Sequence, residues 1–397
     1  MLFICCVALN DNQLNKAFVV NGQDKAQSGY TTQYYRDVLM GVGIVQGLAL
    51  VSYIFWSVEA IDFNFENALK KLAESEQQWM TKDQILNLIT NNVRFRDVTD
   101  FENTDTLAKQ NTGSFSFPSA LSHQKQVSQA VSKISQTIPK SMLTNFTAFT
   151  NRYYNSNNGK QSSNWLYKVI KDMNPGINVT KFVHKFPQPS VIARIDGSEK
   201  PDEILVVSAH QDSINIDSPE NGRAPGADDD GSGSVTILEA LRVLYSSGLC
   251  PKRSVEFHWY AGEEGGLLGS ADVSKAYADK TVVADLHFDM TGYPMDPPAV
   301  GIVTDYTDTD MNRFLRMIVK GYTDLPTKDF QCGYACSDHA SWHERGVKSA
   351  LPFENQYVDG NRNIHTVNDT IDTVDFSHLL KFVKIALGFI IEVSDAT

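Results

Sequence analysis

Apolar and polar positions follow two rhythms in the second half of this chain. Short apolar runs predict strands at SVIARI (190–195), EILVVSA (203–209), SVEFHWYA (254–261) and VVADLHFDM (282–290). Apolar residues then recur at helical spacing in TILEALRVLYSS, LGSADVSKAYAD and DMNRFLRMIVKGY, and a last helix is predicted over 376–393. Strands alternating with helices are typical of an α/β fold, with three layers, α/β/α, around a mixed, mostly parallel central sheet.

The pattern before residue 190 divides the chain into three parts, which we take as 1–60, 61–118 and 119–397. In the second part, TKDQILNLI predicts a short amphipathic helix opened by a capping box of Thr81 and Gln84. The Gly/Ser-rich stretch NTGSFSFPSALS then predicts a linker, with a processing zone at 111–116. The third part is predicted to start with helices, at 124–138, 142–149 and 162–173.

The first part contains an uncharged run, residues 38–58, of about the length that spans a bilayer. Three interpretations compete. The run is a signal anchor that leaves the rest of the chain outside the cell, the apolar core of a cleaved signal peptide, or a buried helix. Small residues at Val58 and Ala60 suit cleavage by a signal peptidase. The first two interpretations place the protein outside the cytosol, and we expect a secreted protein.

Composition narrows the possible partners. The chain has 397 residues, 42% of them hydrophobic, and a net charge of −12, which argues against nucleic acid as a partner.

Of five cysteines, Cys332 and Cys336 are too isolated for a structural zinc site, so we expect a local disulfide in an oxidising compartment. Cys250 is predicted to be a buried thiol. Asparagines in N-x-S/T sequons agree with a secreted glycoprotein: Asn145, Asn178 and Asn368.

Polar residues that suit a hydrolytic metal site follow the predicted strands. They are His210 and Asp212 after VVSA, Asp228, Asp229 and Asp230 in the next loop, Glu263 and Glu264 after HWYAG, Asp289 after DLHF, and His365 near the end. In sheets of this kind, sites form at the carboxyl ends of the strands. Zinc prefers imidazole nitrogen and carboxylate oxygen, and a carboxylate that bridges two ions lets them share an activated water. A neighbouring unbound carboxylate then serves as general base.

Several motifs carry a resemblance to a known family. The segments HQDS, APGADDDGSG, AGEEGGLLGS, DMTGY, TDYTD, CGYACSDHASWH and IHTVNDT resemble, in order, those of secreted two-zinc aminopeptidases, the bacterial and fungal leucine aminopeptidase family. The likeness covers roughly residues 140–395. Residues 76–104 also resemble the propeptide of the fungal enzymes.

The resemblance implies a role for each motif residue. Asp229 would bridge two Zn²⁺ ions, one completed by His210 and Asp289 and the other by Glu264 and His365. Glu263 would be the general base that activates a hydroxide held by the two ions. The supporting residues would be Asp212, which holds the free nitrogen of His210, and Asp230, which follows a non-proline cis bond. Tyr334 would donate a hydrogen bond to the substrate carbonyl, and the side-chain pocket would contain Met290, Val303, Phe353 and Tyr357.

The resemblance thus predicts a secreted, monomeric zymogen that removes apolar residues from the N-termini of peptides. Gly360 stands where related bacterial enzymes have an aromatic residue, which predicts a larger or looser pocket. The alternatives are a carboxypeptidase, a dipeptidase or a single-zinc glutaminyl cyclase of the same fold, and a non-catalytic ectodomain. We expect His258, His287 and His343 to be structural, and Asp338 to support the site or the fold.

Overall fold

The computed structural model describes residues 16–20, 76–91, 93–98, 115–173 and 175–395. The chain forms two compact units, Met1–Thr99 and Asp100–Thr397. The apolar run at 38–58 lies outside the described residues, as do residues 111–114 of the predicted linker. The rest of that stretch, from Phe115, is not a free linker, because Phe117 is buried in the larger core and Phe115 packs against it. In the part of the chain that the structure describes, no helix is both long enough and apolar enough to cross a membrane.

The first unit contains a small antiparallel sheet and one helix. The strands pair in the order β2 (Glu76–Met80), β1 (Lys16–Val20) and β3 (Phe95–Asp97). Helix α4 (Lys82–Thr90) starts with the predicted capping box, because Gln84 N donates to Thr81 Oγ1 at 3.3 Å and Thr81 N donates to Gln84 Oε1 at 2.8 Å. The capping-box prediction is therefore confirmed.

The second unit is built on a six-stranded sheet that confirms the predicted mixed, mostly parallel arrangement. The strand order is β11-β8-β6-β7-β5-β4, with parallel pairing from β11 to β7 and antiparallel pairing of β5 with both neighbours. The bounds are β4 Asn178–Phe182, β5 Ser190–Ile195, β6 Lys200–His210, β7 Arg253–Tyr260, β8 Thr281–His287 and β11 Ser349–Ala350. A smaller sheet joins β10 (Thr327–Phe330), β9 (Val300–Val303) and β12 (Pro352–Phe353).

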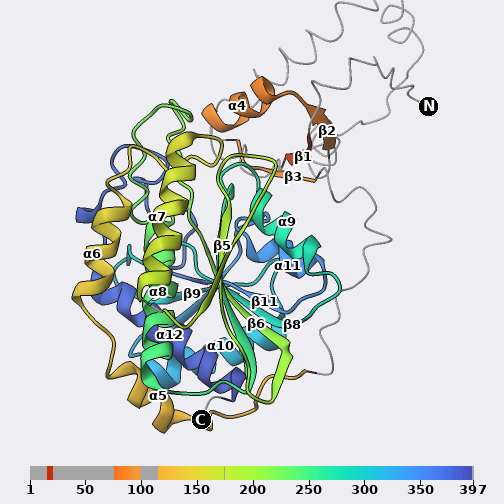
Figure 1. The fold of residues 1–397 in the computed structure, drawn as a ribbon. Coiled ribbons are helices and arrows are strands. Elements are labelled where there is room, and N and C mark those ends of the chain that lie inside the picture. The colour runs from red at the N-terminus through yellow and green to blue at the C-terminus, as the bar shows by residue number, and fades with distance from the viewer. Residues whose placement is uncertain (1–15, 21–75, 92, 99–114, 174, 396–397) are drawn as a thin grey trace, which may run out of the picture. The chain divides into compact units, whose positions relative to one another are not determined.

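Helices cover both faces of the large sheet, as predicted (Figure 1). Alternate residues of β6 point to opposite faces: Leu205 and Val207 belong to the larger core, whereas Ile204 and Val206 belong to the smaller one. The larger core includes residues of α5 (Gln124–Val131), α6 (Thr137–Phe146), α7 (Asn157–Met173), α8 (Gly231–Ser247), α10 (Thr309–Tyr322) and α12 (Phe376–Ser394). The smaller core includes residues of α9 (Leu268–Ala276) and α11 (His339–Glu344).

Several helix boundaries differ from the sequence prediction. The helices predicted over 142–149 and 162–173 both begin earlier, as α6 at Thr137 and α7 at Asn157. Two further differences have a visible cause. The helix expected over 124–138 ends at Val131, because a turn at Ser135 is held by Glu239, whose Oε1 accepts from Ser135 N at 2.6 Å. The Ser135 hydroxyl then accepts from the N–H of Ile138 at 3.1 Å, inside the first turn of α6. Helix α8 starts at Gly231, before the predicted position, because Asp230 caps its first turn through Gly233 N.

The parallel strands bring the predicted site residues to one edge of the sheet. Within the sheet His210 is paired with Tyr260, and Ser208 is paired with His287. Since β6, β7 and β8 run in the same direction, the segments that follow them leave the sheet side by side. These are the segments that carry Asp212, Glu263 and Asp289.

Candidate metal centre and active site

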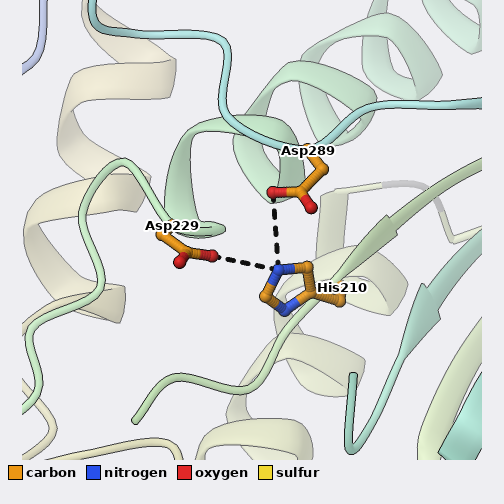
Figure 2. A group of neighbouring side chains, drawn as sticks. All are labelled: His210, Asp229 and Asp289. Atoms are coloured by element: carbon orange, nitrogen blue, oxygen red, sulfur yellow. Dashed lines mark ion pairs between the residues drawn. The ribbon is translucent and has the colours of Figure 1, made fainter. Parts of the chain in front are cut away.

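Two groups of possible metal ligands share Asp229. One group is His210, Asp229 and Asp289, and the other is Asp229, Glu264 and His365; within each group the ligand atoms lie within 4.8 Å of one another. Figure 2 shows two carboxylates that converge on one nitrogen of the His210 ring. This Nε2 lies 3.1 Å from Asp229 Oδ1 and 3.5 Å from Asp289 Oδ1. In the second group, His365 Nε2 lies 3.0 Å from both Asp229 Oδ2 and Glu264 Oε2.

The atoms in these groups fit zinc. His210 Nε2, Asp289 Oδ1 and Glu264 Oε1 are buried and have no hydrogen-bond partner within the described residues. Buried polar atoms left in this state cost free energy, whereas imidazole nitrogens and carboxylate oxygens are the donors that zinc binds. The five predicted ligands therefore come together in two groups that could hold a metal ion.

The charges in the site are strongly coupled. Burial opposes protonation of His210, but the carboxylates of Asp289, Asp212 and Asp229 outweigh it and raise the pKa of His210 well above 6.5. Burial likewise opposes ionisation of Asp229, but the neighbouring imidazoles of His210 and His365 hold its pKa well below its usual range. Asp229 is therefore an ionised carboxylate, ready to bind cations on both sides.

Asp230 joins three segments of the site. Its Oδ2 accepts from the backbone N–H of His210 at 3.0 Å, and its Oδ1 accepts from Gly233 N at 2.9 Å and Met290 N at 3.1 Å. The peptide bond between Asp229 and Asp230 is cis, as the resemblance implied. Asp230 thus fixes the end of β6, the start of α8 and the segment after β8 relative to one another.

The backbone of the aspartate loop is held by a residue to which sequence reasoning gave no role. Asp369 accepts from Asp228 N at 2.9 Å and from Asp229 N at 3.1 Å. Asp228 itself accepts from Gly292 N at 3.0 Å and from Asn361 Nδ2 at 2.8 Å, so it contacts neither ligand histidine. The signal for Asp369 was its place in IHTVNDT, four residues after His365.

Asp212 connects the first ligand to the pair Glu263–Glu264. Its Oδ1 lies 3.4 Å from Nδ1 of His210 and accepts from Glu263 N at 3.1 Å, and its Oδ2 accepts from Glu264 N at 3.2 Å. Gly262, with φ of 74°, turns the chain just before the pair. Asp212 therefore sits beside the His210 nitrogen that the resemblance assigned to it, and it also orients both glutamates.

An apolar cluster lies next to the metal ligands. Its buried members are Met290, Val303, Cys332, Leu351 and Phe353, and Phe330, Tyr334, Cys336, Val358 and Ile364 pack against them. Met290 follows Asp289 in the chain, and Ile364 precedes His365. Four of the five predicted substrate-contacting residues therefore come together beside the candidate metal centre.

Comparison with known proteins places this site in a family. The sequence pattern of Peptidase family M28 matches residues 190–390. A probable leucine aminopeptidase of Arthroderma otae is 40% identical over 346 residues, which are 83% of this chain and 91% of the relative. The chain belongs to peptidase family M28.

Other relatives agree with this membership. Leucine aminopeptidase 1 of Paracoccidioides brasiliensis is 39% identical over 352 residues, which are 83% of this chain and 90% of the relative. Among solved structures, the LapA aminopeptidase of Legionella pneumophila is 31% identical with a TM-score of 0.71, and the match covers 81% of this chain and 93% of LapA. The fold and the family predicted from the sequence are therefore confirmed.

Two positions near the predicted side-chain pocket have the following surroundings. Tyr357 is 54% exposed and lies outside the apolar cluster, against which the next residue, Val358, packs. A Cβ atom on Gly360 would lie 2.8 Å from Nδ2 of Asn355, so this asparagine side chain occupies the space beside the glycine. Of the cysteine predictions, the disulfide between Cys332 and Cys336 is confirmed. The prediction for Cys250 is wrong, because this residue is exposed rather than buried.

His258 and His287, two of the histidines predicted to be structural, have partners inside the fold. His258 Nε2 lies 2.9 Å from Glu256 Oε2, and His287 is held between the hydroxyls of Ser208 and Ser337 at 2.9 and 2.8 Å. Asp338 is buried and accepts a hydrogen bond from Ser270.

Proposed function

We propose that this protein is a two-zinc aminopeptidase that removes apolar, leucine-like residues from the N-termini of peptides. Membership of peptidase family M28 and the leucine aminopeptidase relatives support the coarser statement, that it is a zinc-dependent aminopeptidase. The observation that carries the two-ion form is the position of Asp229, whose Oδ1 faces one ligand group and whose Oδ2 faces the other.

His210, Asp229 and Asp289 would hold one ion, and Asp229, Glu264 and His365 would hold the other. When bound, zinc supplies Lewis acidity, which makes a water more acidic and a carbonyl more electrophilic. Each group offers three protein ligands, which is the number that catalytic zinc sites use while keeping a position open. The chain orients these ligands through Asp212 and Asp230.

Glu263 is the proposed general base. It belongs to neither ligand group, and its backbone is fixed by Asp212. Burial raises the pKa of Glu263 well above 4.5, and the nearby carboxylates of Asp338 and Glu264 raise it further. A carboxyl group with a raised pKa suits a residue that takes the proton of the attacking water and then delivers it to the leaving amine.

The apolar cluster supports the preference for apolar residues. One of its buried side chains, Met290, directly follows Asp289 in the chain. A leucine side chain of the substrate would pack in this cluster while the leucine carbonyl lies at the metal ligands. Tyr334, at the edge of the same cluster, would donate its hydroxyl hydrogen to the substrate carbonyl oxygen. The free amine of the substrate would be held by a carboxylate of the two ligand groups.

We also propose that the protein is a monomer made as a secreted zymogen whose part before about residue 118 is removed. The Cys332–Cys336 disulfide supports an oxidising compartment. Mass measurement and N-terminal sequencing of the product from its native host test this proposal. A start between residues 110 and 120 supports it, and a membrane-bound product that still carries 38–58 would show an anchored enzyme instead.

The catalytic proposal is tested with substrates that separate the rival activities. Purified protein is assayed on leucine anilide, N-acetyl-leucine anilide, a carboxypeptidase substrate and a peptide with N-terminal glutamine, and its zinc content is measured. We expect hydrolysis of the unblocked anilide alone, with two zinc ions per chain. Cyclisation of glutamine with a single zinc ion, or cleavage from the carboxyl end, would overturn the proposal.

A further inference from the structure

The turn between β9 and α10 has the sequence TDYTD, residues 304–308, and its polar side chains are all engaged. Thr304 Oγ1 donates to Phe330 O at 3.0 Å, and Thr307 Oγ1 donates to Val303 O at 2.9 Å. Asp308 caps α10 by accepting from Met311 N at 2.8 Å. The proposed function uses none of these residues.

Asp305 reaches from this turn to the loop that carries the disulfide. Its Oδ1 accepts from Cys332 N at 3.0 Å, and its Oδ2 accepts from Gly333 N at 2.7 Å. Gly333 has φ of 85°, a left-handed conformation that glycine adopts without strain. Successive backbone N–H groups beside such a residue form a concave site for an anion, and here the anion is a side chain of the protein itself.

The hydrogen bonds to Asp305 attach the disulfide loop to the segment after β9, which the disulfide itself does not do. The bond between Cys332 and Cys336 joins two residues of one short loop, so it shapes the loop without attaching it to the strands. Asp305 follows the β9 strand by two residues and holds the loop with two charge-assisted hydrogen bonds. The residue directly after the second bonded amide is Tyr334.

We infer that Asp305 is a positioning residue for Tyr334: it fixes the disulfide loop so that the phenol hydroxyl meets the reacting carbonyl. The inference rests on the proposed function, in which Tyr334 donates to that carbonyl. The Tyr334 ring packs against the cluster of Met290, Val303 and Phe353, which sets one side of its position. The two hydrogen bonds of Asp305 fix the other side of the ring's position, through the loop. A shift of about 1 Å in a catalytic group is enough to lower rates by about 100-fold.

The test is a double-mutant cycle of Asp305→Asn and Tyr334→Phe, assayed on leucine anilide. Asparagine keeps the size of the side chain but accepts only one of the two N–H groups well, so we expect kcat to fall by about 10-fold to 100-fold with KM nearly unchanged. Because both residues act through one hydroxyl, the double variant is expected to have the kcat of Tyr334→Phe alone. Asp305→Glu, which keeps the charge but displaces it, should fall between wild type and Asp305→Asn.

A matched control lies on the strand that leads into the same loop. Asp329 is exposed and pairs with Arg316 at 2.8 and 3.1 Å, so Asp329→Asn removes a neighbouring carboxylate without touching the loop. We expect this control to keep the wild-type kcat. The zinc content of all variants should equal that of wild type, because Asp305 belongs to neither ligand group.

A second readout does not depend on activity. Loss of one of the two hydrogen bonds should let a dithiol reductant open the Cys332–Cys336 disulfide faster in Asp305→Asn than in wild type, as followed by alkylation and mass measurement. Three results would each overturn the inference. They are a wild-type kcat in Asp305→Asn, a loss of kcat in the double variant equal to the product of the two single losses, and equal rates of disulfide opening in Asp305→Asn and wild type. A wild-type protein that does not hydrolyse leucine anilide would instead contradict the proposed function, and the disulfide rates would then decide alone whether Asp305 holds the loop.

Discussion

Asp229 lies 3.0 Å from His365, measured from Oδ2 to Nε2, while its other carboxylate oxygen faces His210 at 3.1 Å. An amide has only one oxygen, so Asp229→Asn leaves one of the two ligand groups without its shared member. We expect this variant to hold at most one zinc ion per chain and to lose more than about 100-fold in activity. Zinc content by mass spectrometry and kcat/KM on leucine anilide provide the measurement.

The preceding aspartate is the matched control. Asp228 accepts from Gly292 N and Asn361 Nδ2 and touches neither ligand histidine, and burial raises its pKa to about 6. Asp228→Asn keeps an oxygen for Gly292, so we expect two zinc ions to remain, with an affinity loss of about 10-fold. Equal losses of zinc in the two variants would show that the bridging residue has been chosen wrongly.

Glu263→Gln separates metal binding from proton transfer. Glutamine preserves the backbone N–H that donates to Asp212 but accepts no proton at its side chain. We expect normal zinc content and a fall in kcat of about 100-fold to 10,000-fold, the usual contribution of a general base. The variant and wild type are compared on leucine anilide across the pH range, and full activity in the variant would contradict the assigned mechanism.

The sequence was most informative where one strand or one motif decides the position of a residue. The run SVIARI became β5 with the predicted bounds. The last residue of β6, His210, and the segments after β7 and β8, with Glu263 and Asp289, lie at one edge of the sheet. These positions follow from the direction of parallel strands, which a sequence pattern reveals. The shared role of Asp229 came from the family resemblance, and the structure places its oxygens accordingly.

Residues in irregular segments were harder to predict, because their contacts depend on how distant loops meet. Val358 rather than Tyr357 packs in the apolar cluster, although the two are adjacent. Helix α8 begins at Gly231, in a Gly/Ser stretch with low helix propensity, where Asp230 caps its first turn. Packing with distant segments requires the small residue, because a Cβ on Gly231 would lie 2.6 Å from both Gly226 O and Leu143 Cδ1. No local pattern carries that information.

Glu256, which belongs to neither ligand group, makes the free energy of unfolding depend on pH. Burial opposes its ionisation, but His258, Arg194 and Tyr277 outweigh this and lower the pKa of Glu256 to about 2. In unfolded chains a glutamate binds a proton near pH 4.5, so the stabilisation by Glu256 is present above that pH and is lost as the pH falls toward about 2.

Glu256→Gln removes this dependence. We expect the free energy of unfolding of wild type to exceed that of the variant at pH 7, and the difference to shrink by up to about 3 kcal/mol between about pH 5 and pH 2. Urea unfolding of both proteins at several pH values measures it, and any loss of metal at low pH affects both alike. A difference that stays constant with pH would contradict the role assigned to Glu256.

Arg152 holds both ends of the loop between His210 and Asp229, two of the three ligands of the first group. Its side chain is fully buried and donates to Gln211 O at 2.8 Å, Pro225 O at 2.5 Å and Gly226 O at 2.8 Å. Burial lowers the pKa of Arg152 to about 10, although Asp369 and other carboxylates of the site raise it. The residue therefore remains a cation at neutral pH and places a positive charge behind the acidic ligands.

Arg152→Met should leave the buried carbonyls of Gln211 and Pro225 without this donor, each costing about 1–3 kcal/mol, whereas Gly226 O still accepts from Gly231 N at 3.1 Å. The substitution should also remove the positive charge behind the site. We expect a loss of several kcal/mol in the free energy of unfolding, and weaker stabilisation of the ligand loop before zinc binds. Urea unfolding of the metal-free protein measures this. Arg223→Met is the control, because Arg223 is exposed and donates to the carbonyls of Phe149 and Thr147 on a neighbouring segment. An exposed residue of this kind should cost no more than about 1 kcal/mol, and equal losses in the two variants would contradict the special role of Arg152.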